Sequence, residues 1–148
     1  MNIFDVPQEV LRTPDLEMLR APELPSGEPT TSGIQIVFSE QLRAYYQHDQ
    51  RAMWSRWNPW PRPCFNAKLL GDIRAYHDFL ARSDAQIECM GKQHPIEYVV
   101  LASDKPGVFN LGGDLDFVKK LIGEHDRAEL LRYGRACIDV LYSNYTAF

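Results

Sequence analysis

The segment Asn-Leu-Gly-Gly-Asp-Leu at positions 110–115 has the composition of a turn that binds anions through its backbone. Adjacent glycines let the main chain approach a ligand closely and adopt dihedral angles that other residues resist. The residues after Asp114 predict a helix, whose first amides lack intrahelical partners and whose dipole favours negative charge. Such a turn can donate N–H groups to an anion or a developing oxyanion. The plainer interpretation is a strand-to-helix turn with Asp114 as the N-cap.

The other titratable and nucleophilic side chains form no recognisable catalytic pattern. The spacing of His48, His77 and His94 fits neither a triad nor a metal site, and His125 is interpreted as a helix-entry residue. No serine lies in a GxSxG nucleophile elbow. The three cysteines are odd in number and lack CxxC spacing, so we expect ordinary thiols and no metal ligands.

Hydrophobic periodicity predicts the elements that would position the turn. The aliphatic run from Ile96 to Ala102 predicts a buried strand, which a glycine-bearing loop at 103–107 joins to the turn. A short helix from Leu115 to Ile122, closed by Gly123, follows the turn. A last helix is predicted from about Arg127 to Tyr142. Its apolar face is expected to comprise Leu130, Gly134, Cys137, Ile138 and Leu141.

Upstream of this strand, the sequence predicts a hairpin and a helix. The alternation from Ile34 to Phe38 and the extended stretch 51–57 would pair across a polar turn at 47–50. We expect the nearby aromatic residues to pack across strands, with a lipid or cofactor contact as the alternative; they are Tyr45, Tyr46, Trp54, Trp57 and Trp60. Asn66 is the expected N-cap of a helix that ends near Ser83, before a loop at 84–95. The apolar face of this helix comprises Leu69, Leu70, Ile73, Tyr76 and Leu80.

The first 32 residues differ in composition from the rest of the chain. They hold five of the ten prolines and carry six acidic residues against two basic ones. We interpret residues 1–32 as an arm that is either disordered or packed on a partner subunit. Residues 33–148 form the expected domain, an α/β arrangement in which about three strands leave the sheet incomplete.

Composition excludes several classes of function. No apolar run approaches the roughly 18 residues of a membrane helix, and the N-terminus does not resemble a secretory signal. We therefore expect a cytoplasmic protein without a membrane partner. A net charge of −4 argues against a general nucleic-acid binder, although it leaves room for a local cationic patch.

Three segments of the chain, one of which contains the turn, follow one another in a recognisable order and spacing. The run Tyr-Val-Val-Leu-Ala-Ser at 98–103 leads through a loop to Val-Phe-Asn-Leu-Gly-Gly-Asp-Leu at 108–115, and Phe-Asn-Ala lies upstream at 65–67. Together these passages resemble the crotonase (enoyl-CoA hydratase/isomerase) superfamily over roughly residues 34–148. With Cys64, the segment 126–133 and Cys137, the chain is most similar to the diffusible-signal-factor synthase branch. The resemblance implies the N-terminal part of a ββα-repeat spiral.

The resemblance also implies an activity and a set of site residues. The amide of Gly113 would be the first oxyanion-hole donor, within the turn that also contains Gly112 and Asp114. Groups around Cys64, Phe65, Asn110 and Leu111 would line the adenine and pantetheine side of the ligand, and Leu115 and Phe117 would wall the acyl channel. The substrate would be an acyl thioester of coenzyme A or of a carrier protein's phosphopantetheine, with no separate tightly bound cofactor. The implied enzyme is a hydratase-type lyase. The signal-factor synthase branch implies, as its specific form, an enzyme that makes cis-2-unsaturated fatty-acid signals by dehydration and thioester hydrolysis. Its full-length form is expected to be a trimer or a hexamer.

The remaining family machinery is not recognisable in these 148 residues. The family takes a second amide from a later Gly-rich turn and its acid–base glutamates from the residues after it, so we expect the parent protein to continue past Phe148. Glu124 and Glu129 are interpreted as solvated surface charges. We therefore expect the chain alone to be inactive. The alternatives are a non-catalytic module that binds CoA or acyl carriers or serves assembly, and an unrelated α/β domain.

Overall fold

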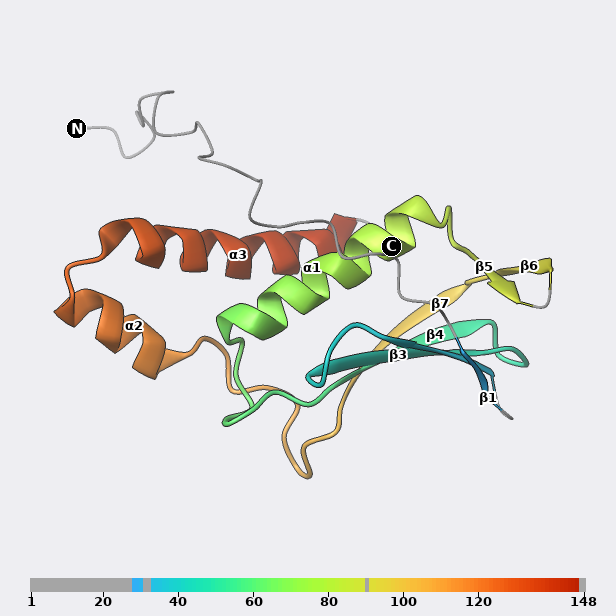
Figure 1. Ribbon diagram of the computed structural model, residues 1–148, viewed down its shortest axis with the longest axis horizontal. Helices are drawn as coiled ribbons and strands as arrows, with labels where there is room; N and C mark the ends of the chain where they lie inside the picture. Colours follow the sequence, from blue (N-terminus) through green and yellow to red (C-terminus); the bar gives the residue numbers. More distant parts are fainter. Residues whose placement is uncertain (1–27, 31–32, 90, 147–148) are drawn as a thin grey trace, which may run out of the picture.

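The protein is a mixed α/β chain, and its computed structural model describes residues 28–30, 33–89 and 91–146 (Figure 1). Apart from residues 28–30, the expected arm lies outside these residues. The elements in chain order are β1 (Glu28–Thr30), β2 (Gly33–Val37), β3 (Leu42–Gln47), β4 (Ala52–Trp57), α1 (Ala67–Arg82), β5 (Gln86–Cys89), β6 (Lys92–Pro95), β7 (Tyr98–Ser103), α2 (Leu115–Gly123) and α3 (Arg127–Thr146). β1 falls within the segment assigned to the arm, so the sheet extends beyond the expected boundary at residue 33.

The main sheet has five strands in the order β1-β2-β3-β4-β7. Neighbouring strands from β1 to β4 are antiparallel, and β7 pairs in parallel with β4 after the crossover that contains α1. The predicted turn at 47–50 is confirmed, but the strand that pairs with β4 is β3 and not the stretch 34–38. A tight turn separates β2 from β3, because the N–H groups of Phe38 and Ser39 both donate to the Leu42 carbonyl. This turn lacks the glycine or proline that marks most reversals, so the sequence did not reveal it.

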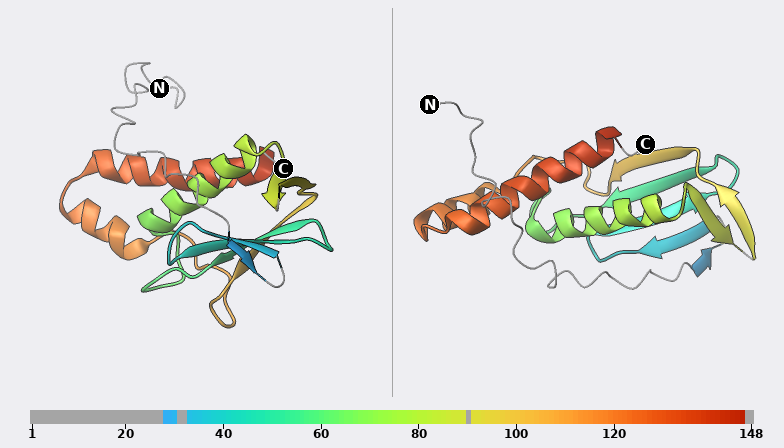
Figure 2. Two further views of the ribbon diagram at one scale, coloured as in Figure 1. Left: turned by 45° about the vertical axis from the view of Figure 1, so that its right-hand side comes forward. Right: turned by 90° about the horizontal axis from the view of Figure 1, so that it is seen from above.

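The core lies between one face of this sheet and α1. Asn66 caps α1 as predicted, because its Oδ1 accepts the Leu69 N–H at 2.9 Å. The predicted apolar face of α1 is buried in full, and it meets inward-facing residues of β3 and β4 such as Leu42 and Trp57. Both α1 and α3 lie on this side of the sheet, with α3 beyond α1 (Figures 1 and 2). On the opposite face, Tyr45 stacks on Trp54 at a ring-centroid distance of 6.0 Å, which confirms the expected cross-strand packing for this pair.

Three further predicted features are wrong. Residues 84–95 contain the β5–β6 hairpin, not only a loop. The strand β7 lies at an edge of the main sheet and is partly exposed, with Tyr98 63% exposed, because only β4 pairs with it. In α3, the buried residues are Tyr133 and Val140, whereas Ile138 and Leu141 of the predicted face are exposed. The helix is thus turned by about one residue, roughly 100°, from the expected orientation.

No helix in the described part of the chain combines the length and the apolar character that crossing a bilayer requires.

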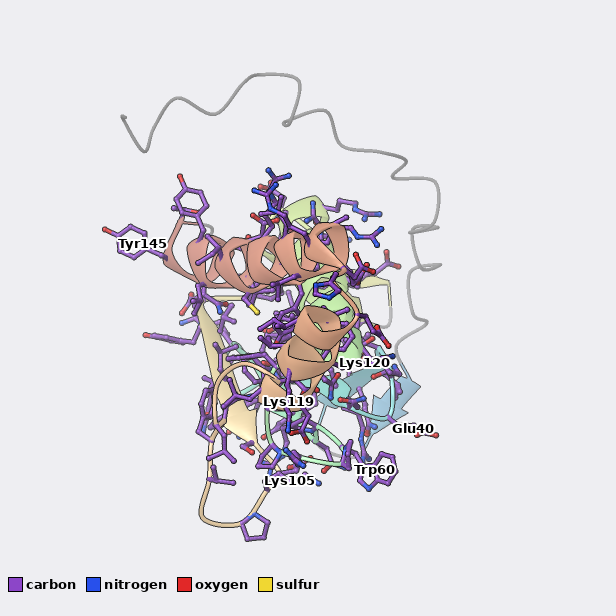
Figure 3. All side chains as sticks on the ribbon, turned by 90° about the vertical axis from the view of Figure 1, so that its left-hand side faces the viewer. Glu40, Trp60, Lys105, Lys119, Lys120 and Tyr145 are labelled. Carbon is purple, nitrogen blue, oxygen red and sulfur yellow. The ribbon has the colours of Figure 1, made fainter. Side chains whose placement is uncertain are left out.

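Trp60 does not take part in the aromatic packing expected for it. Its side chain is 72% exposed and projects from the connection between β4 and α1 (Figure 3).

Candidate functional site

The loop between β7 and α2 folds back along the residues that precede α1. The Leu111 N–H donates to the Pro63 carbonyl at 2.7 Å, and the Phe65 N–H donates to the Gly112 carbonyl at 2.8 Å. Phe65 and Gly113 form a parallel β-bridge. The structure therefore brings together the two segments, 64–65 and 110–114, that the sequence resemblance placed at one site.

The conformation of the turn depends on Asn110 and Gly112. Gly112 has a φ of +90°, a region that side-chain-bearing residues rarely adopt. The Oδ1 atom of Asn110 accepts the Gly112 N–H at 2.7 Å, which fixes the start of the turn. The Nδ2 atom of Asn110 is buried and has no hydrogen-bond partner among the described residues.

Asp114 ends the turn and begins α2. Its Oδ1 accepts the Phe117 N–H at 3.2 Å, so the predicted N-cap is confirmed. The carboxylate and the positive end of the helix dipole stabilise each other here.

Tyr133 of α3 reaches this turn, a contact that the sequence did not predict. Its hydroxyl accepts the Asp114 N–H at 2.5 Å and donates to the Phe65 carbonyl at 2.7 Å. Burial raises the pKa of Tyr133 to about 12, so the hydroxyl keeps its proton and donates at neutral pH. A Cβ atom on Gly113 would lie 3.3 Å from this hydroxyl, so residue 113 is packed closely against Tyr133.

The N–H of Gly113 is the amide that the arrangement leaves available. The amides on either side of it donate to Asn110 and to Tyr133. Within the described residues, the Gly113 N–H has no hydrogen-bond acceptor, and Gly113 itself is exposed. The turn therefore contains a donor without an acceptor, in an exposed residue whose neighbouring amides are both bonded.

The expected ligand-lining residues differ in their surroundings. Leu111 and Leu115 are 69% and 76% exposed, beside the Gly113 amide in sequence. Phe117 is half-buried and packs edge-on against the Tyr133 ring at 5.3 Å. Cys64 is buried, and burial raises the pKa of its thiol, so it is a poor nucleophile. Leu115 and Phe117 thus do not share one environment.

The acidic residues that follow the turn are engaged elsewhere. Glu124, the C-cap of α2, lies 4.0 Å from the Lys120 ammonium, and Glu129 pairs with Arg132 within α3. These contacts agree with their interpretation as surface charges. Asp116, which follows the cap, pairs with Arg62.

The structure also pairs two histidines whose spacing suggested no partner. His48 Nε2 lies 3.1 Å from His94 Nδ1, although the residues are 46 positions apart. No group of three or more histidine, cysteine, aspartate or glutamate residues in the described ranges is arranged to hold a metal ion.

No protein-family model matches this sequence, and no curated protein matches it.

Proposed function

We propose that this chain supplies the first oxyanion-hole turn of an acyl-thioester enzyme of the crotonase type, as the N-terminal part of that fold. The observation that supports the proposal is that the N–H of Gly113, an exposed residue, has no acceptor among the described residues. Its neighbours are held by Asn110 and Tyr133, so the donor is oriented before any ligand arrives. Oriented donors of this kind stabilise charge without reorganising during the reaction.

In the proposed role, the Gly113 amide donates to the carbonyl oxygen of an acyl thioester. Negative charge accumulates on that oxygen when the thioester forms an enolate or a tetrahedral intermediate. The first residue of α2 lies two residues further along, and the N-terminal end of the helix adds a favourable dipole. Loss of one such donor costs on the order of 10²–10³ in rate in a complete enzyme.

The proposed reaction is a hydratase-type lyase reaction, with the dehydration and thioester hydrolysis of the signal-synthase branch as its specific form. The acyl group would be carried by coenzyme A or by a carrier protein's phosphopantetheine. Proton transfer needs a carboxylate near the substrate, and Glu124 and Glu129 are held in ion pairs instead. We therefore assign to this chain thioester binding and oxyanion stabilisation only, and expect it to be inactive alone.

A second candidate is a binding or assembly module for CoA or acyl-carrier ligands, which needs no free glutamate and is therefore compatible with the same ion pairs. The two candidates differ in whether the acyl carbonyl is polarised. An enzyme half-site should shift the bound carbonyl's infrared stretch to lower frequency, because a hydrogen bond weakens the C=O bond. A module that recognises only the nucleotide and pantetheine should leave this stretch unchanged.

The test uses the full chain and a decanoyl-CoA thioester labelled with ¹³C at its carbonyl. Calorimetry measures binding, and infrared difference spectroscopy measures the carbonyl stretch. Replacing Gly113 by glycolic acid substitutes an ester for the amide and removes the N–H. It also weakens the Gly112 carbonyl as the acceptor of the Phe65 N–H, so circular dichroism must show that this variant is folded. We expect this change to abolish the frequency shift, while the same replacement at exposed Gly107 retains it. The absence of any binding, or a shift that persists in the Gly113 ester, would refute the oxyanion proposal.

A further inference from the structure

A pair of histidine side chains joins two hairpins at the end of the sheet remote from the Gly113 turn. His48 lies in the turn between β3 and β4, and His94 lies in β6. His48 Nε2 and His94 Nδ1 are 3.1 Å apart, and the ring centroids are 4.6 Å apart. His48 is exposed and His94 is partly exposed, so solvent and small ions have access to the pair.

The backbone under both histidines is held by separate contacts. The buried Tyr46 donates its hydroxyl to the Pro95 carbonyl at 2.8 Å, and its ring lies 6.4 Å from each imidazole. The Arg51 carbonyl accepts the Glu97 N–H at 2.8 Å, and the two side chains form an ion pair at 2.7 Å. The spacing of the two imidazoles is therefore set by the fold, not by the flexibility of one loop.

The distance between the two nitrogens suits a metal ion that binds both. With metal–nitrogen bonds of about 2.1 Å, a separation of 3.1 Å corresponds to an N–metal–N angle of about 95°. This angle is close to the right angle between adjacent ligands in tetragonal and octahedral complexes. Imidazole is a preferred ligand of Cu²⁺, Ni²⁺ and Zn²⁺, and tetragonal geometry is typical of Cu²⁺ and Ni²⁺.

We propose that His48 and His94 form a two-histidine chelate for a divalent first-row transition-metal ion, with Cu²⁺ and Ni²⁺ as the best geometric fit. On binding, the donating imidazole changes tautomer, so that its proton moves to its other ring nitrogen and both facing nitrogens present lone pairs. Small ring rotations would then direct these two lone pairs to one point, which the ion occupies. Water completes the coordination, because the described residues provide no third protein ligand. Bound metal would pin the β5–β6 hairpin to the β3–β4 turn. This inference is independent of the proposed acyl-thioester function.

The test is calorimetric titration of the full chain with NiCl₂ at neutral pH. We expect one ion per chain, and an affinity that falls roughly tenfold or more in both H48N and H94N. The matched control is H125N, which removes another exposed histidine. Residue 125 has a φ of +56°, a conformation that asparagine tolerates. Circular dichroism checks that each variant is folded. Absence of binding in the wild type, or affinity retained in H48N and H94N, would overturn the proposal.

A second measurement needs no variant. In the ¹H–¹⁵N NMR spectrum of the wild type, Cu²⁺ added at less than one equivalent should first broaden the amide signals of residues 46–50 and 92–96. Broadening centred on Cys64, Cys137 or the chain terminus would show that the ion binds elsewhere and would overturn the assignment.

Discussion

At the scale of single residues, the Tyr133 hydroxyl joins three parts of the chain that are distant in sequence. It connects the carbonyl before α1, the N-cap of α2 and the body of α3 through two hydrogen bonds. Without the Tyr133 hydroxyl, the Asp114 N–H and the Phe65 carbonyl would lose their hydrogen-bond partner or would have to move to find another. The geometry of the Gly113 turn therefore depends on a residue outside it.

The Y133F substitution should lower the free energy of unfolding by about 1–3 kcal/mol, because it leaves the Asp114 N–H and the Phe65 carbonyl without their partner. Urea denaturation followed by circular dichroism measures this change. Y142F is the matched control, since Tyr142 lies on the same helix and is 66% exposed, and it should change stability by less than about 0.5 kcal/mol. Equal stability of the two variants would show that the Tyr133 bonds contribute nothing.

The cap at Asp114 gives a second residue-scale prediction. D114A should destabilise the protein by about 0.5–2 kcal/mol, because the Phe117 N–H loses its acceptor. D114N should recover most of this loss, since an asparagine oxygen can also cap a helix. If D114N were as unstable as D114A in the same urea assay, the role of Asp114 would be its charge and not its cap.

At the scale of elements, α1 and α3 are joined by a buried polar contact. His77 of α1 lies 2.9 Å from the Asn144 Oδ1 of α3, and the exposed Arg74–Asp139 ion pair joins the same helices. Burial lowers the pKa of His77 below its ordinary value of 6.5, an effect that the Asn144 hydrogen bond and the charge of Asp78 partly oppose. The two helices are therefore packed around a neutral imidazole.

This contact predicts a pH dependence of stability. The unfolded chain takes up the His77 proton near pH 6.5, whereas the folded protein takes it up only at lower pH. The contribution of the neutral His77 side chain to stability is thus complete above about pH 6.5. It decreases as the pH falls towards the pKa of His77 in the folded protein. Chemical denaturation between about pH 5.5 and 7.5 should show this decrease in the wild type and in H125N, but to a smaller extent in H77Q. An identical pH profile for H77Q would contradict the assignment.

At the scale of the whole molecule, apolar surface is left uncovered on α3 and along β7. Ile138 and Leu141 are 63% and 57% exposed, and Tyr145 projects freely from the end of α3 (Figure 3). β7 lies at the edge of the main sheet. An exposed apolar surface and a free strand edge both favour association with another chain.

We therefore expect the chain to self-associate as its concentration rises, which sedimentation velocity can measure. The double substitution I138E/L141E should shift the distribution towards the monomer, because it places two like charges on the apolar surface. A128E adds a glutamate at an exposed position in the first turn of α3 and should leave the distribution unchanged. A wild-type chain that stays monomeric and unfolds cooperatively at all concentrations would contradict this expectation.

Features set by neighbours in sequence could be predicted from the sequence alone. The caps at Asn66 and Asp114 depend on contacts within one helical turn, and the buried face of α1 follows the helical period of its apolar residues. The structure confirms each of these predictions. The sequence also indicated the two segments that meet at the candidate site. In these cases the side-chain type and the helical period carry the information.

Only the tertiary structure decided the remaining features. The buried stripe of α3, the edge position of β7, and the contacts of Tyr133 and His48 depend on partners far away in sequence. On α3 apolar residues occur on more than one face, so periodicity could not show which face would meet α1. The Gly-Gly-Asp turn was visible in the sequence as a possible anion-binding backbone. The structure showed that Asn110 and Tyr133 accept the amides on either side, whereas the N–H of exposed Gly113 has no acceptor among the described residues.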